Sequence, residues 1–150
     1  MMSGHCRRHT MPRIQIQLPE HFGFSTEIPL YTSHINAAGH LDNAQLLFIV
    51  SEARERFLLS MGYHSKNIEG LSFILADAAV QYKSEAFYGE VLVVAMAATD
   101  FNKRGCDFVY RVTDRASGRE VARGKSGVVF FDYGQRQVAD VPAAFRARWP

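Results

Sequence analysis

The sequence contains one strong helical pattern, and most of the chain after it has the two-residue period of β-strands. Between residues 43 and 61, apolar side chains recur at spacings of three and four, the period of an amphipathic helix. These side chains are Leu46, Val50, Ala53, Phe57 and Met61. Asp42 and Gln45 form a capping-box pattern at its start, and Gly62 is typical of the position after a helix end. We therefore expect a helix over 43–61, about 28 Å long.

Alternating hydrophobic residues predict five strands around this helix. The predicted strands are residues 24–34, 72–83, 88–101, 107–115 and 119–132. Pro29 lacks an N–H donor, which places the first strand at a sheet edge or at a bulge. The segment 141–149 is expected to form a short helical turn. One strand, a long helix and four strands joined by tight turns indicate an α+β fold, with an antiparallel sheet wrapped around one helix.

A single helix cannot cover five long strands, and such a sheet leaves edges that need protection. Association of two copies through a sheet edge or a helix face would supply the missing cover. Phe48 lies near the polar side of the predicted helix, where a second chain could contact it.

Length and composition narrow the class of protein. The 150 residues suit one domain, which we assign to residues 14–150, with residues 1–13 as a disordered leader. A net charge of +2 is too small to indicate a nucleic-acid partner. No run of about 18 apolar residues occurs, so we expect no membrane-spanning helix. Cys6 and Cys106 do not form a disulfide framework, which favours a reducing compartment and hence a cytoplasmic protein.

Three segments resemble the 4-hydroxybenzoyl-CoA thioesterase-like proteins of the hotdog superfamily. Residues 34–43 read HINAAGHLDN, where that family usually has D-x-D-x-x-G-H-V-N-N between its first strand and its helix. Residues 52–58 read EARERFL and match the helix signature, and residues 83–90 read KSEAFYGE and resemble the turn R-x-A-x-Y-G-D. The resemblance implies a hotdog fold, with a five-stranded antiparallel sheet around one long helix, and a homodimer or homotetramer.

The same resemblance implies an acyl-CoA thioesterase, which hydrolyses a thioester to a carboxylic acid and free coenzyme A. Coenzyme A would then be part of the substrate, with no separate cofactor. However, the catalytic carboxylate of the family is the second Asp of D-x-D, and this chain has Asn36 there and His34 at the first position. The sequence is similar to a branch that reads I-N-x-x-x-H-L-x-N, so the usual mechanism cannot be transferred to it.

Hydrolysis of a thioester requires donors for the oxyanion that forms on its carbonyl. A helix N-terminus offers unpaired N–H groups and a partial positive charge, and the resemblance places the carbonyl there. We expect the donors to be backbone N–H groups near Gly39, His40 and Leu41. Gly39, Leu41 and Asn43 are accordingly assigned to substrate binding.

The predicted catalytic residues are Asn36, His40 and Asp42. Asn36 is neutral and cannot be a base, but its amide can donate to a carbonyl or orient a water. Either His40 or Asp42 would activate the water, since histidine titrates near neutral pH and Asp42 lies at the helix start. Each also has a structural interpretation, as a loop amide, a backbone-bonded histidine and an N-cap. Glu52 is expected to pair with Arg56, four residues on.

Further residues have two interpretations each. Asp77 interrupts an apolar strand, so it either contributes to the acyl pocket or faces solvent. Four cations could contact the phosphates of coenzyme A, or could be ordinary surface charges: Lys103, Arg104, Arg123 and Lys125. We expect no metal site. The alternative is a metal held by His5, Cys6 and His9.

The loss of the carboxylate at position 36 supports a second hypothesis, a hotdog protein that binds acyl-CoA or an aromatic ligand without hydrolysing it. A third is a hotdog dehydratase acting on 3-hydroxyacyl chains, which is disfavoured because such enzymes carry their catalytic His in a different motif.

Overall fold

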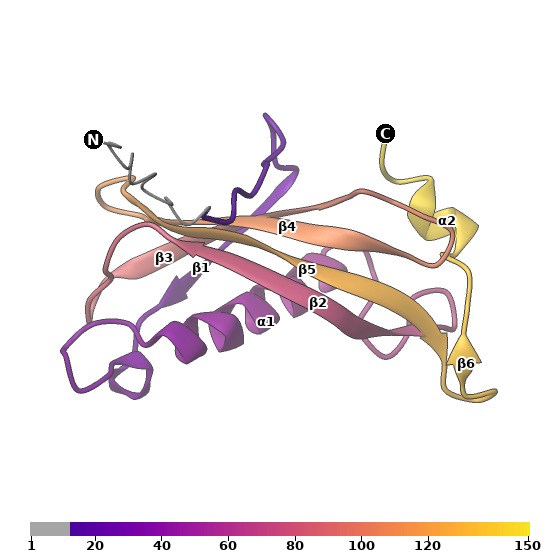
Figure 1. Ribbon diagram of the computed structural model, residues 1–150, viewed down its shortest axis with the longest axis horizontal. Helices are drawn as coiled ribbons and strands as arrows, with labels where there is room; N and C mark the ends of the chain where they lie inside the picture. The colour runs from indigo at the N-terminus through magenta and orange to yellow at the C-terminus, as the bar shows by residue number, and fades with distance from the viewer. Residues whose placement is uncertain (1–12) are drawn as a thin grey trace, which may run out of the picture.

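A six-stranded antiparallel sheet curls around one long helix in the computed structural model, which describes residues 13–150 (Figure 1). The strand order is β1-β3-β4-β5-β2, with the short β6 paired to β5. The strands are β1 (Phe24–Pro29), β2 (Ser72–Tyr82), β3 (Val91–Thr99), β4 (Gly105–Asp114), β5 (Glu120–Asp132) and β6 (Gln137–Val138). This arrangement is the one predicted for a hotdog fold, and Pro29 lies in an edge strand as expected.

Helix α1 (Asn43–Leu59) begins at the residue that the sequence indicated and ends just before the predicted C-terminal signal. Asp42 is the N-cap, and its Oδ2 accepts hydrogen bonds from the N–H groups of Ala44 (2.9 Å) and Gln45 (3.2 Å). Gly62 has a φ of 83°. The Tyr63 N–H donates to the Leu58 carbonyl at 2.9 Å, which closes the helix in a Schellman motif. The predicted capping box is only half formed, because the Asp42 N–H donates to the His34 carbonyl at 2.9 Å.

The core lies between α1 and the concave face of the sheet. The buried side chains of the helix are Leu46, Ile49, Val50, Ala53, Phe57 and Leu58. On β4 every second residue faces them, including Phe108, Tyr110 and Val112, each at most 1% exposed. The short helix α2 (Ala143–Arg146) closes one end of this core with the fully buried Phe145, and it confirms the helical turn predicted over 141–149.

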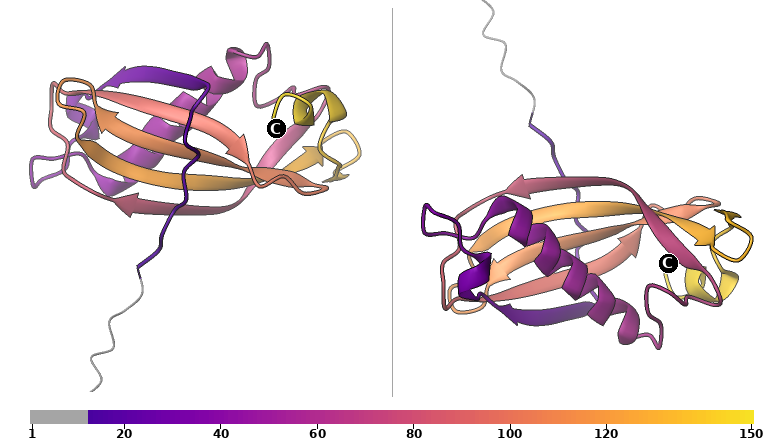
Figure 2. Two further views of the ribbon diagram at one scale, coloured as in Figure 1. Left: turned by 90° about the horizontal axis from the view of Figure 1, so that it is seen from above. Right: turned by 90° about the horizontal axis from the view of Figure 1, so that it is seen from below.

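The opposite face of the sheet is crossed by the extended segment 13–23, which runs from β2 towards β1 (Figure 2). The Ile16 N–H donates to the Gln81 Oε1 at 2.7 Å, and the Arg111 guanidinium lies 5.4 Å from the centre of the Phe22 ring. Ala95 is paired in register with Arg111 and lies beside Phe22 on this face, and it is only 8% exposed. The segment therefore covers apolar surface that a bare sheet would expose to water.

The boundaries differ from the predicted ones where turns interrupt the pattern. The strand predicted over 24–34 stops at Pro29, and Thr32–His34 form a 3-10 helix, η1. The strand predicted over 88–101 is shortened at both ends by residues with positive φ, Gly89 (85°) and Asp100 (50°). The helix stops at Leu59 rather than residue 61, and β6 adds a sixth strand. Among residues 13–150, no helix has the length and apolar character needed to cross a membrane.

Candidate active site

A pocket of about 350 Å³ opens at the N-terminal end of α1. Five of the seven predicted site residues line it: Asn36, His40, Leu41, Asp42 and Asn43. The other walls come from Leu46 of α1, Val121 of β5 and the segment 82–86, which begins at the last residue of β2. The loop before the helix and the turn after β2 are about 40 residues apart in the sequence, and the pocket forms where they meet.

The side chain of Asn36 holds the loop together. Its Oδ1 accepts hydrogen bonds from the N–H groups of Ala38 (3.0 Å) and His40 (3.4 Å). Because a backbone N–H can only donate, these contacts fix which end of the amide is the oxygen. The Nδ2 group makes no hydrogen bond with the described residues, so it remains available as a donor at the pocket.

The backbone donors differ from those expected. The Gly39 N–H already donates to the Asn36 carbonyl at 3.0 Å, and the Leu41 N–H donates to the Ala86 carbonyl at 2.7 Å. The expectation that the N–H groups of residues 39–41 are free for an oxyanion is therefore wrong. Within the described part of the chain, the N–H of Asn43 is the one at the start of α1 that makes no hydrogen bond, because Asp42 takes those of Ala44 and Gln45.

His40 presents one ring nitrogen to the pocket. Its Nδ1 lies 3.2 Å from the Leu41 carbonyl oxygen, which can only accept, so Nδ1 carries a proton in this contact. Its Nε2 lies 3.8 Å from the Glu85 Oε1. The backbone contact thus selects the tautomer that leaves Nε2 free to take up a proton, with a carboxylate beside it.

Asp42 and Tyr82 meet at the start of the helix. The Tyr82 hydroxyl donates to the Asn43 carbonyl at 3.0 Å. Burial raises the pKa of Tyr82, and the negative charge of Asp42 adds to this shift. The hydroxyl therefore remains a neutral donor across the physiological range. The hydrogen bonds to Asp42 are made to its Oδ2, so its Oδ1 is free of partners among residues 13–150.

The structure does not bring Asp77 to this pocket. Its side chain is 60% exposed on β2, and its Oδ1 lies 2.9 Å from the Lys125 Nζ. Two of the other cations considered for phosphate binding are also paired with carboxylates, Arg104 with Asp140 and Arg123 with Glu120. The predicted pair of Glu52 and Arg56 is present, with Nε and Oε1 2.8 Å apart.

Sequence reasoning missed the pocket wall formed by residues 82–86. Two of its side chains carry charge, Lys83 and Glu85. Lys83 forms no ion pair among the described residues. The motif KSEAFYGE marked this turn, but a local pattern does not reveal that it packs against a loop so distant in sequence. No group of three or more His, Cys, Asp or Glu side chains within 13–150 is placed to hold a metal, and His5, Cys6 and His9 lie outside the described residues.

The fold and this pocket together define a hotdog protein with a candidate site at the N-terminus of its helix. A family model described as the thioesterase-like superfamily matches residues 31–149. The match covers most of the chain, so the protein belongs to the thioesterase-like superfamily. The comparison of the sequence with curated proteins finds no relative.

Solved structures of thioesterases share the fold. A 1,4-dihydroxy-2-naphthoyl-CoA thioesterase from Synechocystis has a TM-score of 0.75 and 23% identity, covering 83% of this chain and 93% of its own. A DHNA-CoA thioesterase from Staphylococcus aureus has a TM-score of 0.72 and 17% identity, covering 83% and 84%. A gentisyl-coenzyme A thioesterase has a TM-score of 0.73 and 16% identity, covering 82% and 99%. At these identities the likeness is one of fold.

Proposed function

We propose that this protein hydrolyses acyl-CoA thioesters to a carboxylic acid and free coenzyme A. The observation that carries the proposal is the pocket at the start of α1, where a free backbone N–H, a histidine and a carboxylate line one cavity in a member of the thioesterase-like superfamily. The coenzyme A thioesters named for three solved structures of the same fold support this class of substrate.

In the proposed reaction a water attacks the carbonyl carbon of the thioester. The negative charge that develops on the carbonyl oxygen is stabilised by the Asn43 N–H and by the Asn36 Nδ2. A donor that is already in place at a helix N-terminus needs no reorganisation as the charge forms, which is why such groups contribute strongly to acyl transfer.

His40 is the proposed base. Its Nε2 takes a proton from the attacking water, and the carboxylate of Glu85, 3.8 Å away, favours the imidazolium that results. The C–S bond then breaks, and the proton passes from His40 to the departing sulfur. Asp42 orients the water through its free Oδ1. The reaction uses only water and groups of the chain, with coenzyme A entering as part of the substrate.

The test is release of free thiol from short-chain, long-chain and aromatic acyl-CoA esters, measured against a mock purification. We expect turnover that falls by roughly 10²-fold or more in His40→Ala, the range for loss of a general base. Asp42→Asn is the matched variant at the helix start, because Asn caps helices as well as Asp does. Release from none of the esters would overturn the activity, and unchanged turnover in both variants would overturn the assigned roles.

A binding protein without hydrolytic activity is the second candidate, because position 36 carries no carboxylate. Asn36→Asp separates the two hypotheses. A carboxylate oxygen can accept the same N–H groups from Ala38 and His40, so the loop should keep its shape. Thiol release that appears only in this variant would favour the binding protein.

We propose a homodimer formed through β2 as the working assembly. This strand is paired with β5 on one side, is eleven residues long and is exposed through its middle, whereas the other edge strand, β1, has six residues and ends at Pro29. Tetramer formation across the outer face of the sheet is disfavoured, because the segment 13–23 occupies that face. The cytoplasm is the proposed location, on the basis of the cysteine usage.

A further inference from the structure

Arg119 lies outside the pocket but is bonded to the segment that forms one of its walls. It ends the turn between β4 and β5, whose tightness comes from Gly118 at a φ of 74° and from the Asp114 side chain. The Asp114 Oδ2 accepts hydrogen bonds from both the N–H (3.0 Å) and the hydroxyl (2.6 Å) of Ser117. These contacts hold the backbone of the turn in place, and so they fix the position from which the Arg119 side chain extends.

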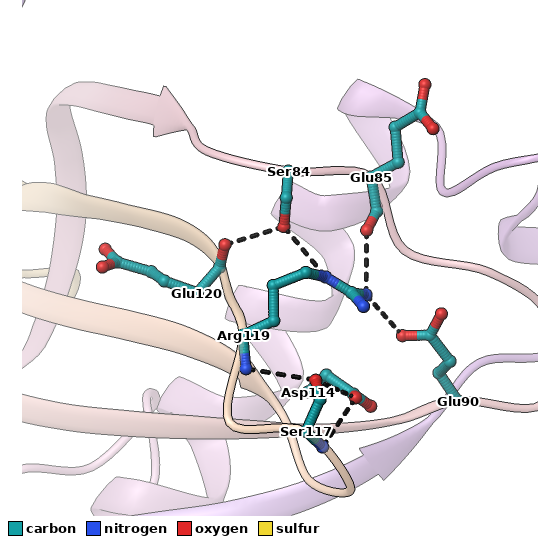
Figure 3. A network of polar contacts seen from close by, with 7 residues as sticks. All are labelled: Ser84, Glu85, Glu90, Asp114, Ser117, Arg119 and Glu120. Carbon is teal, nitrogen blue, oxygen red and sulfur yellow. Dashed lines mark hydrogen bonds and ion pairs between the residues drawn. The ribbon is translucent and has the colours of Figure 1, made fainter.

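The guanidinium of Arg119 joins three points of the segment 84–90 (Figure 3). Its Nε donates to the Ser84 hydroxyl at 3.1 Å. Its Nη2 donates both to the Glu85 carbonyl at 3.0 Å and to the Glu90 Oε2 at 2.7 Å. The Ser84 hydroxyl in turn donates a hydrogen bond to the Glu120 carbonyl at 2.7 Å, which ties the segment to the start of β5.

The same segment makes two contacts with the loop of the candidate site. The carbonyl of Ala86, a residue only 1% exposed, accepts the Leu41 N–H at 2.7 Å. The carboxylate of Glu85 lies 3.8 Å from the His40 Nε2. Leu41 directly precedes the N-cap of α1, so displacement of Ala86 would shift the residues that set the direction of the Asn43 N–H.

We infer that Arg119 is a positioning residue for the proposed active site. It fixes the segment 84–90 so that Ala86 anchors Leu41 and Glu85 stands beside His40. The expected effect of Arg119 on catalysis rests on the proposed thioesterase activity. Its expected effect on the order of the loop before α1 does not depend on that activity.

An arginine suits this position for geometric reasons. Its planar fork can donate in three fixed directions at once, whereas a lysine places a single charge at one point. The side chains of Arg119 and Glu90 are 37% and 21% exposed, so the pair is shielded more than an ordinary surface ion pair. Because the guanidinium is planar and rigid, the arginine side chain also loses less conformational entropy for each hydrogen bond that it forms.

The first measurement is amide hydrogen exchange of the substrate-free protein. In Arg119→Gln, we expect the Leu41 amide and the segment 84–90 to exchange faster, while amides in β3 and β4 keep the wild-type rate. Arg115→Gln is the matched control. Arg115 is the other arginine of the same turn, but its side chain pairs with the Glu27 Oε2 at 2.8 Å and makes no hydrogen bond or ion pair with the segment 84–90. Glu90→Gln keeps the shape of the acceptor and removes its charge, and it should loosen the same amides.

The second measurement is kinetic. Loss of alignment without loss of fold should reduce kcat by roughly 10- to 100-fold in Arg119→Gln, with a smaller effect on KM. Arg119→Lys should not restore kcat, and Arg119→Gln combined with Glu90→Gln should be no worse than Arg119→Gln alone. Arg115→Gln should behave as the wild type.

The outcomes separate the two proposals. Wild-type exchange of the Leu41 amide in both Arg119→Gln and Glu90→Gln overturns the inference, whatever the activity. Equal losses of kcat in Arg119→Gln and Arg115→Gln overturn it as well, because they would indicate general destabilisation. If the variants exchange the Leu41 amide faster but the wild type releases no thiol, the positioning role of Arg119 is supported and the thioesterase activity is overturned.

Discussion

Asn36 separates the shape of the site from its charge. Its Oδ1 accepts two backbone N–H groups, a task that either oxygen of an aspartate could perform equally well. An aspartate at position 36 would therefore change the charge of the pocket and leave the loop intact. The charged side chains at the pocket are those of Asp42, Lys83 and Glu85. Because Asn36 cannot act as a base, the proposed base is His40, whose Nδ1 is held by the Leu41 carbonyl.

Lys83 is the lysine of the pocket, and it is exposed. If it meets a phosphate of coenzyme A, Lys83→Gln should raise KM for an acyl-CoA about two- to five-fold, the range for an exposed ion pair. The effect should shrink at high salt and vanish with an acyl N-acetylcysteamine thioester, which has no phosphate. Lys66→Gln, at an exposed lysine outside the pocket, is the control. A KM increase of the same size with both thioesters would show that Lys83 does not contact the phosphates.

Cys106 should be an inert thiol, because burial raises its pKa from an ordinary value of 9.0 to about 12. Between these pH values the unfolded chain loses the thiol proton while the folded chain retains it. The contribution of Cys106 to stability should therefore fall as pH rises through this window, by up to about 1.4 kcal/mol per pH unit. The measurement is the difference in free energy of unfolding between a Cys6→Ser protein and its Cys106→Ala derivative at pH 7 and pH 10. A difference that does not change with pH would contradict the prediction.

At the scale of elements, sequence patterns correctly predicted the helix and most strands. The observed ends of these elements differ from the predicted ends where turns interrupt the pattern. Asp42 and Gly62 mark the ends of α1 because capping depends on neighbouring residues alone. The half of the site on residues 36–43 was predictable for the same reason. The other half, residues 82–86 and Val121, is brought there by the pairing of β2 with β5, which no local pattern specifies. The engagement of the Leu41 N–H by Ala86 likewise depends on a tertiary contact.

The small residues of β5 allow one close approach within the sheet. A Cβ added at Gly124 would lie too close to the Tyr110 hydroxyl and to the Ala79 carbonyl. Gly124→Ala should therefore reduce the free energy of unfolding by about 1–3 kcal/mol, the usual cost of overpacking. Adding Tyr110→Phe should recover only a small part of this loss, since it removes the hydroxyl but keeps the ring carbon Cζ, which also lies close to the added Cβ.

The control for this prediction is Gly23→Ala, where an added Cβ would meet nothing within 4 Å. That change should be neutral or slightly stabilising, because alanine restricts the unfolded chain. Denaturant unfolding of the four proteins checks the set. Equal stability of Gly124→Ala and the wild type would show that the strand relaxes around the new methyl group.

At the scale of the whole molecule, the two faces of the sheet are covered in different ways. Helix α1 covers the concave face, and the segment 13–23 crosses the other (Figure 2). The segment contains Ile14, Ile16 and Leu18 at a spacing of two, a strand-like pattern, although it forms no strand. Its contacts are instead made across the strands, to Gln81 and Arg111. Because both faces of the sheet are occupied, a second copy could form the largest number of new backbone hydrogen bonds at the free edge of β2.

Leu75 is the side chain with which to test this assembly. It lies in the exposed middle of β2 and is 53% exposed in the single chain, so a charge there should leave the fold intact. In a dimer formed through β2, the lysine charge would be buried in the interface. Burial of an unpaired charge costs free energy because the charge loses its water, so dimer formation would be disfavoured. Leu75→Lys should therefore convert a dimer to a monomer in light scattering coupled to size exclusion, with an unchanged circular dichroism spectrum.

Tyr31→Lys provides the comparison, because Tyr31 is 59% exposed just after β1, the strand at the opposite edge of the sheet. This variant should remain a dimer. A wild type that is monomeric at all concentrations, or a dimer that survives Leu75→Lys, would rule out the β2 interface. If the monomeric variant keeps its thiol release, each chain contains a complete site, whereas loss of both together would mean that the pocket at the start of α1 needs the second copy.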